Sequence, residues 1–169
     1  RLCKEFVFDK VTKVVVGGIE RIHSVQAGLR EVRPDAVLIA IHDGARPLVS
    51  QEIIRDTVAR AAVTGAAAPA IPLTDTIKRE DGGLTVETVD RSQLWAVQTP
   101  QVFEAGLIRA ATQKALDDGE VLTDDCGAVE RLGMKVTLTS GSRENLKVTT
   151  PLDLILGEAI LRARAEGVL

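Results

Sequence analysis

A carboxylate and a guanidinium group, Asp43 and Arg46, directly follow the most apolar run of the sequence, residues 36–41. If that run forms a buried strand, both side chains project from its carboxyl end, which is where open α/β sheets bind ligands. An aspartate placed there can hold a metal ion or the hydroxyl groups of a substrate. An Asp43–Arg46 ion pair that only fixes the turn is an equally good interpretation, so the residue types leave the two open.

A pair of glycines, Gly17 and Gly18, lies between a β-branched run and a helical pattern that carries Ser24. Free backbone N–H groups at the start of a helix, beside backbone without side chains, suit a nucleotide. A tight turn is the simpler interpretation. The sequence contains neither G-x-G-x-x-G nor G-x-x-x-x-G-K-[ST], which argues against a dinucleotide-binding Rossmann site and against a P-loop.

Other polar residues gather at predicted loops and element ends, and each group is ordinary by itself. Lys147 stands just before the last predicted helix and can reach an anion near that helix's N-terminus, although a solvated lysine is the simpler interpretation. Cys126 is expected to be a small buried helix residue, since no histidine lies beside it in the sequence. The remaining groups are Asp75-Thr76, Asp90-Arg91, Thr99-Pro100-Gln101 and Thr123-Asp124-Asp125.

The composition of the 169 residues fits one globular domain, with 45% apolar and 27% charged residues. The 21 Lys and Arg against 24 Asp and Glu give a net charge of -3, and no dense basic run supports general nucleic-acid binding. Cys3 and Cys126 stand far apart, which indicates neither a zinc site nor a disulfide framework and favours a reducing, cytoplasmic setting. No apolar run is long enough to span a membrane.

The periodicity of the chain predicts alternating strands and helices. Strands are expected at residues 13–16, 36–41, 66–72 and 135–138, and helices at residues 24–31, 50–60, 104–116 and 123–132. Ser50 is the expected N-cap of the second helix and Gly65 its stop, while Thr150 is the expected N-cap of a last helix. This alternation predicts an α/β fold that is Rossmann-like, with a mostly parallel sheet and helices on both faces.

Residues 75–89 break this alternation. Glu80-Asp81-Gly82-Gly83, followed by an alternating polar and apolar run, predicts a β-hairpin outside the main sheet. An isolated hairpin is marginally stable in water, so a partner subunit is an economical surface for it to pack on. The expected organisation is a single domain over residues 1–169 with a projecting dimerisation arm at about residues 75–90.

Several motifs in a fixed order carry a family resemblance: GGIERIHSVQAGL, IHDGARP, DTIKR, TVDRSQLWAVQTPQVF, LTDD and ENLKVTTPLDL. Together they closely resemble the 2-C-methyl-D-erythritol 4-phosphate cytidylyltransferases, from about Val14 to the C-terminal helix. The resemblance implies that CTP and methylerythritol phosphate are joined to give a cytidine diphospho-polyol and pyrophosphate, in non-mevalonate isoprenoid synthesis. It also implies Mg²⁺ or another divalent cation on the triphosphate, and a homodimer linked through hairpin arms.

The resemblance assigns a role to each candidate residue. Arg91 and Lys147 are the expected catalytic pair, because they would hold the polyol phosphate with its oxygen in line with the α-phosphorus of CTP. Thr76 and Arg91, near the two ends of the arm, are expected to serve the active site of the partner subunit. The other residues expected to bind the polyol are Asp43, Arg46, Thr99 and Thr123, and those expected to face the cytidine are Gly18, Ser24 and Gly44.

One part of the family pattern has no counterpart in this sequence, which begins at Arg1. The family's N-terminal strand and glycine-rich basic loop wrap the triphosphate, so we expect a missing strand–loop–helix–strand segment and an impaired or inactive chain without it. Two alternatives stay open at this point. One is ribitol-5-phosphate cytidylyltransferase, which shares much of this framework, and the other is a non-catalytic dimeric remnant of the fold.

Overall fold

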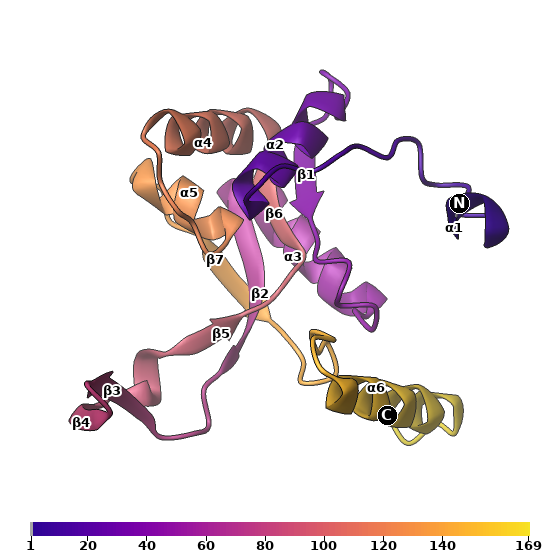
Figure 1. The fold of residues 1–169 in the computed structure, drawn as a ribbon. Coiled ribbons are helices and arrows are strands. Elements are labelled where there is room, and N and C mark those ends of the chain that lie inside the picture. The colour runs from indigo at the N-terminus through magenta and orange to yellow at the C-terminus, as the bar shows by residue number, and fades with distance from the viewer. Residues whose placement is uncertain (1) are drawn as a thin grey trace.

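The computed structural model describes residues 2–169, which form one sheet, a separate hairpin and several helices (Figure 1). The helices are α1 (Leu2–Glu5), α2 (Arg21–Glu31), α3 (Gln51–Thr64), α4 (Ala105–Asp117), α5 (Asp125–Arg131) and α6 (Pro151–Ala165), with a short 3-10 helix η1 (Arg91–Gln93). The strands are β1 (Leu38–Ile41), β2 (Ala66–Pro72), β3 (Ile77–Asp81), β4 (Leu84–Val89), β5 (Trp95–Val97), β6 (Gln101–Glu104) and β7 (Thr137–Ser140).

The main sheet is mixed, so the expectation of a mostly parallel sheet is wrong. Its order is β1-β6-β2-β5, and β7 pairs with β2. Strand β6 is antiparallel to both β1 and β2, β5 is antiparallel to β2, and only the β2–β7 pair is parallel. The chain leaves β2 into the hairpin and then returns along β2 as β5 and β6, without a crossover helix. A strand that returns directly pairs antiparallel. The prediction of a parallel sheet was wrong because it assumed that every connection between strands contains a crossover helix.

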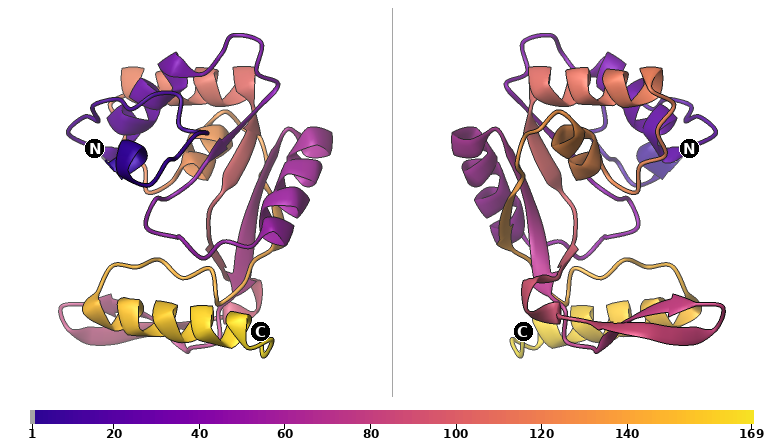
Figure 2. Two further views of the ribbon diagram at one scale, coloured as in Figure 1. Left: turned by 90° about the vertical axis from the view of Figure 1, so that its right-hand side faces the viewer. Right: turned by 90° about the vertical axis from the view of Figure 1, so that its left-hand side faces the viewer.

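Helices do cover both faces of the sheet, as expected (Figure 2). Along β2, Ala66 and Ala68 belong to one apolar cluster, with Phe103 and residues of α4 and α5. Ala67 belongs to a second cluster, which contains Ala61 of α3. Because successive side chains of a strand point to opposite faces, α3 packs on one face of the sheet and α4 and α5 pack on the other.

Local end signals placed helix α3 correctly. The Ser50 hydroxyl accepts a hydrogen bond from the backbone N–H of Ile53 at 3.2 Å, and Gly65 ends the helix with a φ of 81°. Helix α6 also starts as expected, and its Asp153 carboxylate accepts from the backbone N–H of Thr150 at 2.7 Å. None of the described helices is long and apolar enough to cross a bilayer.

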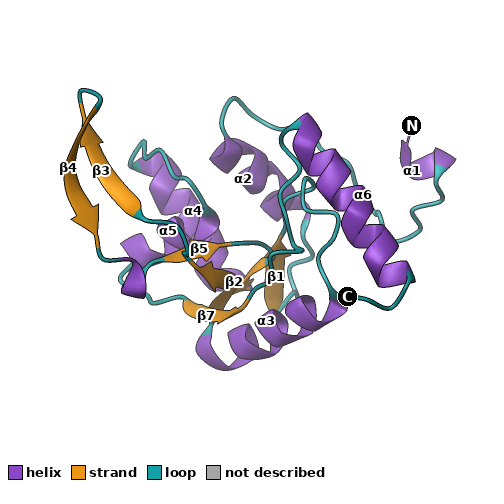
Figure 3. Ribbon diagram, turned by 90° about the horizontal axis from the view of Figure 1, so that it is seen from below, coloured by secondary structure: helices purple, strands orange, loops and turns teal. Residues whose placement is uncertain are grey.

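The hairpin of β3 and β4 is a two-stranded sheet of its own, which confirms the predicted excursion from the main sheet. Gly82 and Gly83 make its turn with φ of 58° and 83°, a backbone conformation that favours glycine. Seen from below, the hairpin and α6 lie on opposite sides of the main sheet (Figure 3). The hairpin therefore stands clear of the body that the helices and the main sheet form.

The strand predicted at residues 13–16 is not formed. This segment runs extended without a strand partner in the part of the chain that the structure describes, and Val14 and Val16 are exposed. β-branched residues favour a strand only where a neighbouring strand and a covered face exist, so propensity alone misled the prediction. Two further differences concern β7, which lies two residues later than predicted, and β5 and β6, which the sequence patterns did not reveal.

Candidate active site

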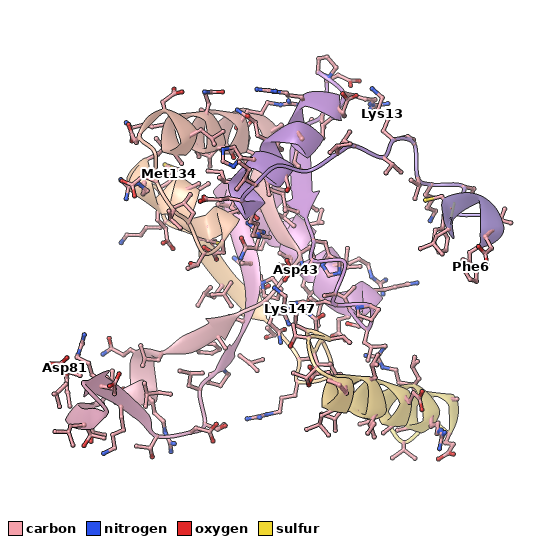
Figure 4. The ribbon with its side chains drawn as sticks, viewed as in Figure 1. Phe6, Lys13, Asp43, Asp81, Met134 and Lys147 are labelled. Carbon is pink, nitrogen blue, oxygen red and sulfur yellow. The ribbon has the colours of Figure 1, made fainter. Side chains whose placement is uncertain are left out.

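Asp43 is the centre of a cluster that joins three distant parts of the chain. Its carboxylate Oδ2 lies 3.1 Å from the Nζ of Lys147 and 3.6 Å from the Nε of Arg46. Its backbone N–H donates to the Oγ1 of Thr99 at 3.0 Å. Figure 4 shows Asp43 and Lys147 side by side, where the main sheet approaches α6. The structure thus brings together four of the residues that the sequence proposed for the polyol, and the Asp43–Arg46 ion pair exists.

The loop that carries Asp43 is held from both sides. The imidazole Nδ1 of His42 lies 2.9 Å from the Thr99 hydroxyl, and its Nε2 lies 3.1 Å from the backbone oxygen of Arg46. The backbone N–H of Val148 donates to the carbonyl of Ala45 at 2.7 Å, which fastens the Lys147 segment to this loop. Since both ring nitrogens of His42 face protein atoms, the residue has a structural role, and the aspartate is the group that the loop presents.

The charged side chains of this cluster differ in how far they are exposed to solvent. The side chains of Arg46 and Asp43 are 14% and 18% exposed, whereas that of Lys147 is 48% exposed. An ion pair that solvent screens only partly holds its members more firmly than a surface pair does. Asp43 and Arg46 therefore form the fixed part of the cluster, and Lys147 is the member that can turn to an incoming anion.

A pocket of about 470 Å³ opens between α2 and β1, next to the Asp43 cluster. Ser24, Asp43 and Gly44 border it with Arg21, and the apolar side chains of α2 and β1 form its wall. The backbone N–H of Gly18 donates to the Ser24 hydroxyl at 3.2 Å, so Gly18 lies beside the same border. Two of the three residues proposed to face the cytidine, Ser24 and Gly44, thus line one pocket next to the residues proposed for the polyol, and Gly18 is bonded to Ser24 outside the lining.

Helix α5 is anchored to this pocket by a salt bridge that the sequence analysis did not find. The guanidinium group of Arg21 donates to both carboxylate oxygens of Asp125, at 2.8 and 2.5 Å, and this hydrogen bonding raises the pKa of Arg21. The side chain of Gln101 accepts from the backbone N–H groups of Asp125 and Cys126 at 3.0 Å. The sequence shows only that Arg21 and Asp125 carry opposite charges. The two residues are far apart along the chain, so their spacing did not predict that they pair.

Three candidate residues stay apart from the Asp43 cluster. Thr123 is exposed just before the first residues of α5. Thr76 and Arg91 lie at the base of the hairpin and are also exposed, and the guanidinium group of Arg91 donates to the carbonyl of Thr74. Within residues 2–169, no hydrogen bond or ion pair joins Thr76 or Arg91 to Asp43. The structure places these two residues on the arm, as the sequence implied, but not in the site of their own chain.

Two further groups bear on the chemistry. Cys126 is buried as expected, and burial raises the pKa of its thiol, which disfavours the reactive thiolate. Among the described residues, no cluster of three or more acidic, histidine or cysteine side chains offers a metal cage. Mg²⁺ commonly binds substrate phosphates with only one or two carboxylates, so such a cage is not what a magnesium–nucleotide complex requires.

Comparison with known proteins gives one consistent result. The family model described as "IspD: 2-C-methyl-D-erythritol 4-phosphate cytidylyltransferase" matches residues 2–163. The enzyme of that name from Caldanaerobacter subterraneus subsp. tengcongensis is 48% identical over 160 residues, which cover 94% of this chain and 70% of the relative. The enzyme from Alkaliphilus metalliredigens is 45% identical over 168 residues, which cover 99% of this chain and 70% of the relative.

The fold agrees with solved structures of the same kind. The crystal structure of 2-C-methyl-D-erythritol 4-phosphate cytidylyltransferase from Thermus thermophilus superposes with a TM-score of 0.81 at 36% identity. The match covers 88% of this chain and 72% of the other. The structure of 4-diphosphocytidyl-2C-methyl-D-erythritol synthase from Anaerococcus prevotii matches with a TM-score of 0.83 at 30% identity, over 96% of this chain and 78% of the other.

Proposed function

The chain belongs to the 2-C-methyl-D-erythritol 4-phosphate cytidylyltransferase family, nucleotidyltransferases of isoprenoid biosynthesis, and on that premise we propose how its residues divide the two substrates between them. The Asp43 cluster binds the polyol phosphate, and the pocket between α2 and β1 receives the cytidine of CTP. The observation that carries this proposal is the convergence of Asp43, Arg46, Thr99 and Lys147 from separate loops.

Lys147 is proposed to exchange one anion for another when the polyol phosphate binds. In the free chain its Nζ pairs with the Asp43 carboxylate at 3.1 Å. The substrate phosphate carries more charge than one carboxylate and reaches the exposed half of the lysine. Lys147 then holds the phosphate, while Asp43, with Arg46 and Thr99 fixed around it, accepts hydrogen bonds from the polyol hydroxyls.

The reaction that follows is an in-line displacement. A phosphate oxygen of the polyol attacks the α-phosphorus of CTP, a new P–O bond forms, and the bond to the β-phosphate breaks so that pyrophosphate leaves. The protein contributes mainly position and charge in this class of reaction. Lys147 and Arg91 are proposed to hold the attacking phosphate, and Gly18, Ser24 and Gly44 are proposed to orient the cytidine. When bound, Mg²⁺ neutralises charge on the triphosphate.

The arm is proposed to complete the site of a second subunit. Thr76 and Arg91 are exposed at its base and have no hydrogen bond or ion pair with Asp43 in the described part of the chain. A homodimer in which each arm reaches the partner brings Arg91 to the substrate phosphate and Thr76 beside the polyol, with Thr123 before α5 near them. Free thiols at Cys3 and Cys126 suit the reducing, cytoplasmic setting that the sequence favours.

The test is pyrophosphate release from CTP and Mg²⁺, with methylerythritol phosphate and ribitol 5-phosphate supplied separately. We expect release with methylerythritol phosphate, and Lys147→Ala should weaken binding of this polyol phosphate by about tenfold or more. Lys114→Ala is the matched control, because Lys114 of α4 is also an exposed lysine in an ion pair, with Asp118 just after that helix. Unchanged polyol binding in Lys147→Ala, measured by calorimetry, would remove Lys147 from the proposed site. Preference for ribitol phosphate would reassign the polyol.

A further inference from the structure

Asn145 is a fully buried amide that stands two residues before Lys147. Its Nδ2 donates to the carbonyl oxygen of Thr99 at 3.0 Å and to the Oε1 of Gln98 at 3.3 Å. Both acceptors belong to the segment between β5 and β6, whose Thr99 hydroxyl also receives the Asp43 backbone N–H. The side chain of Asn145 therefore fastens the Lys147 loop to the residue that holds the Asp43 loop.

The main chain of Asn145 makes a second connection. Its carbonyl oxygen accepts a hydrogen bond from the Nη1 of Arg46 at 2.7 Å, and the Arg46 side chain is 14% exposed. Arg46 in turn faces Asp43, which pairs with Lys147. Asn145 is thus in direct contact with Thr99 and Arg46 and is covalently close to Lys147. His42 makes the matching connection on the Asp43 side, because it contacts Thr99 and Arg46 and directly precedes Asp43 in the chain.

Gln98 extends the same attachment along the loop. Its Nε2 donates to the carbonyl of Ser142 at 2.8 Å, and its Oε1 accepts from the Ser142 backbone N–H at 3.2 Å. A Cβ at Gly141 would lie 2.6 Å from that Oε1 and 3.0 Å from the carbonyl of Ala70, so the loop passes there only without a side chain. Two buried amides therefore clamp the loop before Lys147.

An unpaired atom indicates what this position requires. The Oδ1 of Asn145 is buried and has no hydrogen-bond partner within residues 2–169. An unpaired buried carbonyl is unfavourable, and an apolar side chain of similar size would avoid it. The two hydrogen bonds that Nδ2 donates, to Thr99 and to Gln98, offset this unfavourable term. The position is therefore better explained by its two donated hydrogen bonds than by packing.

We propose that Asn145 is a positioning residue, which fixes the Lys147 ammonium group relative to Asp43 and Thr99 and so controls binding of the polyol phosphate. This inference rests on the proposed polyol site. Asn145 itself does not touch substrate. We expect the effect on the polyol to be the larger one, because Asn145 bonds directly to Thr99 and Arg46, whereas within residues 2–169 it has no hydrogen bond to Ser24 or Gly44 at the cytidine pocket.

The test separates the two substrates. Asn145→Ala should raise the KM for the polyol phosphate by about tenfold while the KM for CTP changes less than about twofold. Thr57→Val is the matched control, because Thr57 is a fully buried polar residue that bonds Ile53 of α3 and Thr139 of β7 and none of the proposed site residues. It should lower the melting temperature without changing either KM. An equal rise of both KM values in Asn145→Ala, or an unchanged polyol KM, would overturn the proposal.

A second variant and a second measurement guard against a folding failure. Asn145→Asp keeps the volume but replaces the donors to the Thr99 carbonyl by a carboxylate, so the same polyol-specific rise is expected. In both variants, acylation of the Lys147 amine should become several-fold faster relative to that of Lys114, because its hold on Asp43 is loosened. Peptide mapping measures this without substrate. An unchanged ratio in a folded variant would contradict the positioning role.

Lys147→Ala, assayed in parallel, tells the two possible failures apart. If Lys147→Ala leaves polyol binding intact, the proposed polyol site is wrong, and the positioning role of Asn145 is rejected with it. If Lys147→Ala weakens polyol binding but both Asn145 variants bind normally, the site stands and the positioning role is rejected.

Discussion

The Asp43 cluster and the base of the hairpin arm are built in opposite ways, although both are proposed to serve one substrate. In the cluster, Asp43, Arg46 and Thr99 are linked by hydrogen bonds and ion pairs that join distant loops. At the arm base, Thr76 and Arg91 are exposed and the contacts are local. Folding of a single chain is enough to assemble the Asp43 cluster. The arm base is proposed to act only when a partner subunit lies against it.

The difference has an energetic meaning for binding. Ligands held in place before substrate arrives lose little conformational freedom on binding, whereas an exposed arginine must be ordered at that moment. Burial of Arg46 and the clamp on the Lys147 loop put the cluster in the first class. We therefore expect the cluster to contribute to stability as well as to substrate binding, and the arm base to contribute to substrate binding and catalysis but not to stability.

The largest expected effect separates these contributions at the arm. Arg91→Ala should lower kcat/KM, because a charge-assisted contact to the substrate phosphate is lost. The loss should correspond to about 2–4 kcal/mol of transition-state stabilisation. Its free energy of unfolding should stay within about 0.5 kcal/mol, because the residue is exposed. Pyrophosphate release and urea unfolding measure the two quantities. Arg79→Ala is the control, since Arg79 is an exposed arginine of the arm paired with Glu87, and it should leave kcat/KM unchanged.

Mixed subunits sharpen the same comparison. If the arm acts on the partner, combining impaired Arg91→Ala with impaired Lys147→Ala subunits should restore part of the activity, because one site of the mixed dimer keeps both groups. Lack of recovery despite proven subunit exchange would place Arg91 in the site of its own chain.

A smaller effect is expected for the cluster itself, and this one appears in stability. Asp43→Asn removes the anion between Arg46 and Lys147 and should lower the free energy of unfolding by about 1–3 kcal/mol. Asp118→Asn, which breaks the exposed pair with Lys114, should cost less than about 0.5 kcal/mol. Urea unfolding of both variants gives the comparison. Equal losses would show that the Asp43 cluster is no more preassembled than a surface ion pair.

The smallest expected effect concerns the start of α6, just beyond Lys147. Hydrogen bonds from the backbone N–H groups of Thr149 and Thr150 lower the pKa of Asp153 below its usual 3.8. The carboxylate therefore stabilises the folded state above pH 3.8, and this stabilisation is lost as the pH falls through the lowered pKa. Asp153→Asn should melt below the unchanged protein at neutral pH, and the difference should vanish in acid. A difference that persists in acid would assign the effect to something other than the carboxylate.

Features encoded by a few neighbouring residues were predictable from the sequence. Ser50 and Gly65 define α3 because capping is local, and Gly82-Gly83 defines the hairpin turn for the same reason. Strand direction was not predictable, because it depends on how the chain returns after the hairpin. Strands β5 and β6 were missed because a proline and polar glutamines interrupt their short apolar runs. The run at residues 13–16 has the right residue types but no strand partner in the described part of the chain.

The site was predictable only as a set of separate loops. The rule that ligands bind where strands end singled out Asp43 and Arg46, and the last predicted helix singled out Lys147. The family motifs then assigned roles to these residues and to Thr99. Neither approach found Asn145, because nothing in a single sequence marks an asparagine in a polar loop as fully buried. The hydrogen bonds that make Asn145 interesting join residues far apart along the chain, and only the fold brings them together.

Strand β2 limits how far this sequence can drift. Ala66, Ala67, Ala68 and Ala70 are at most 1% exposed, with helices packed on both faces of the strand. A larger side chain there has no room, and overpacking a core typically costs about 1–3 kcal/mol. The tip of the hairpin is limited in another way: a Cβ at Gly82 or Gly83 meets nothing within 4 Å, but the positive φ of both residues favours glycine. Side-chain volume therefore restricts substitutions in β2, whereas backbone conformation restricts them at the arm tip.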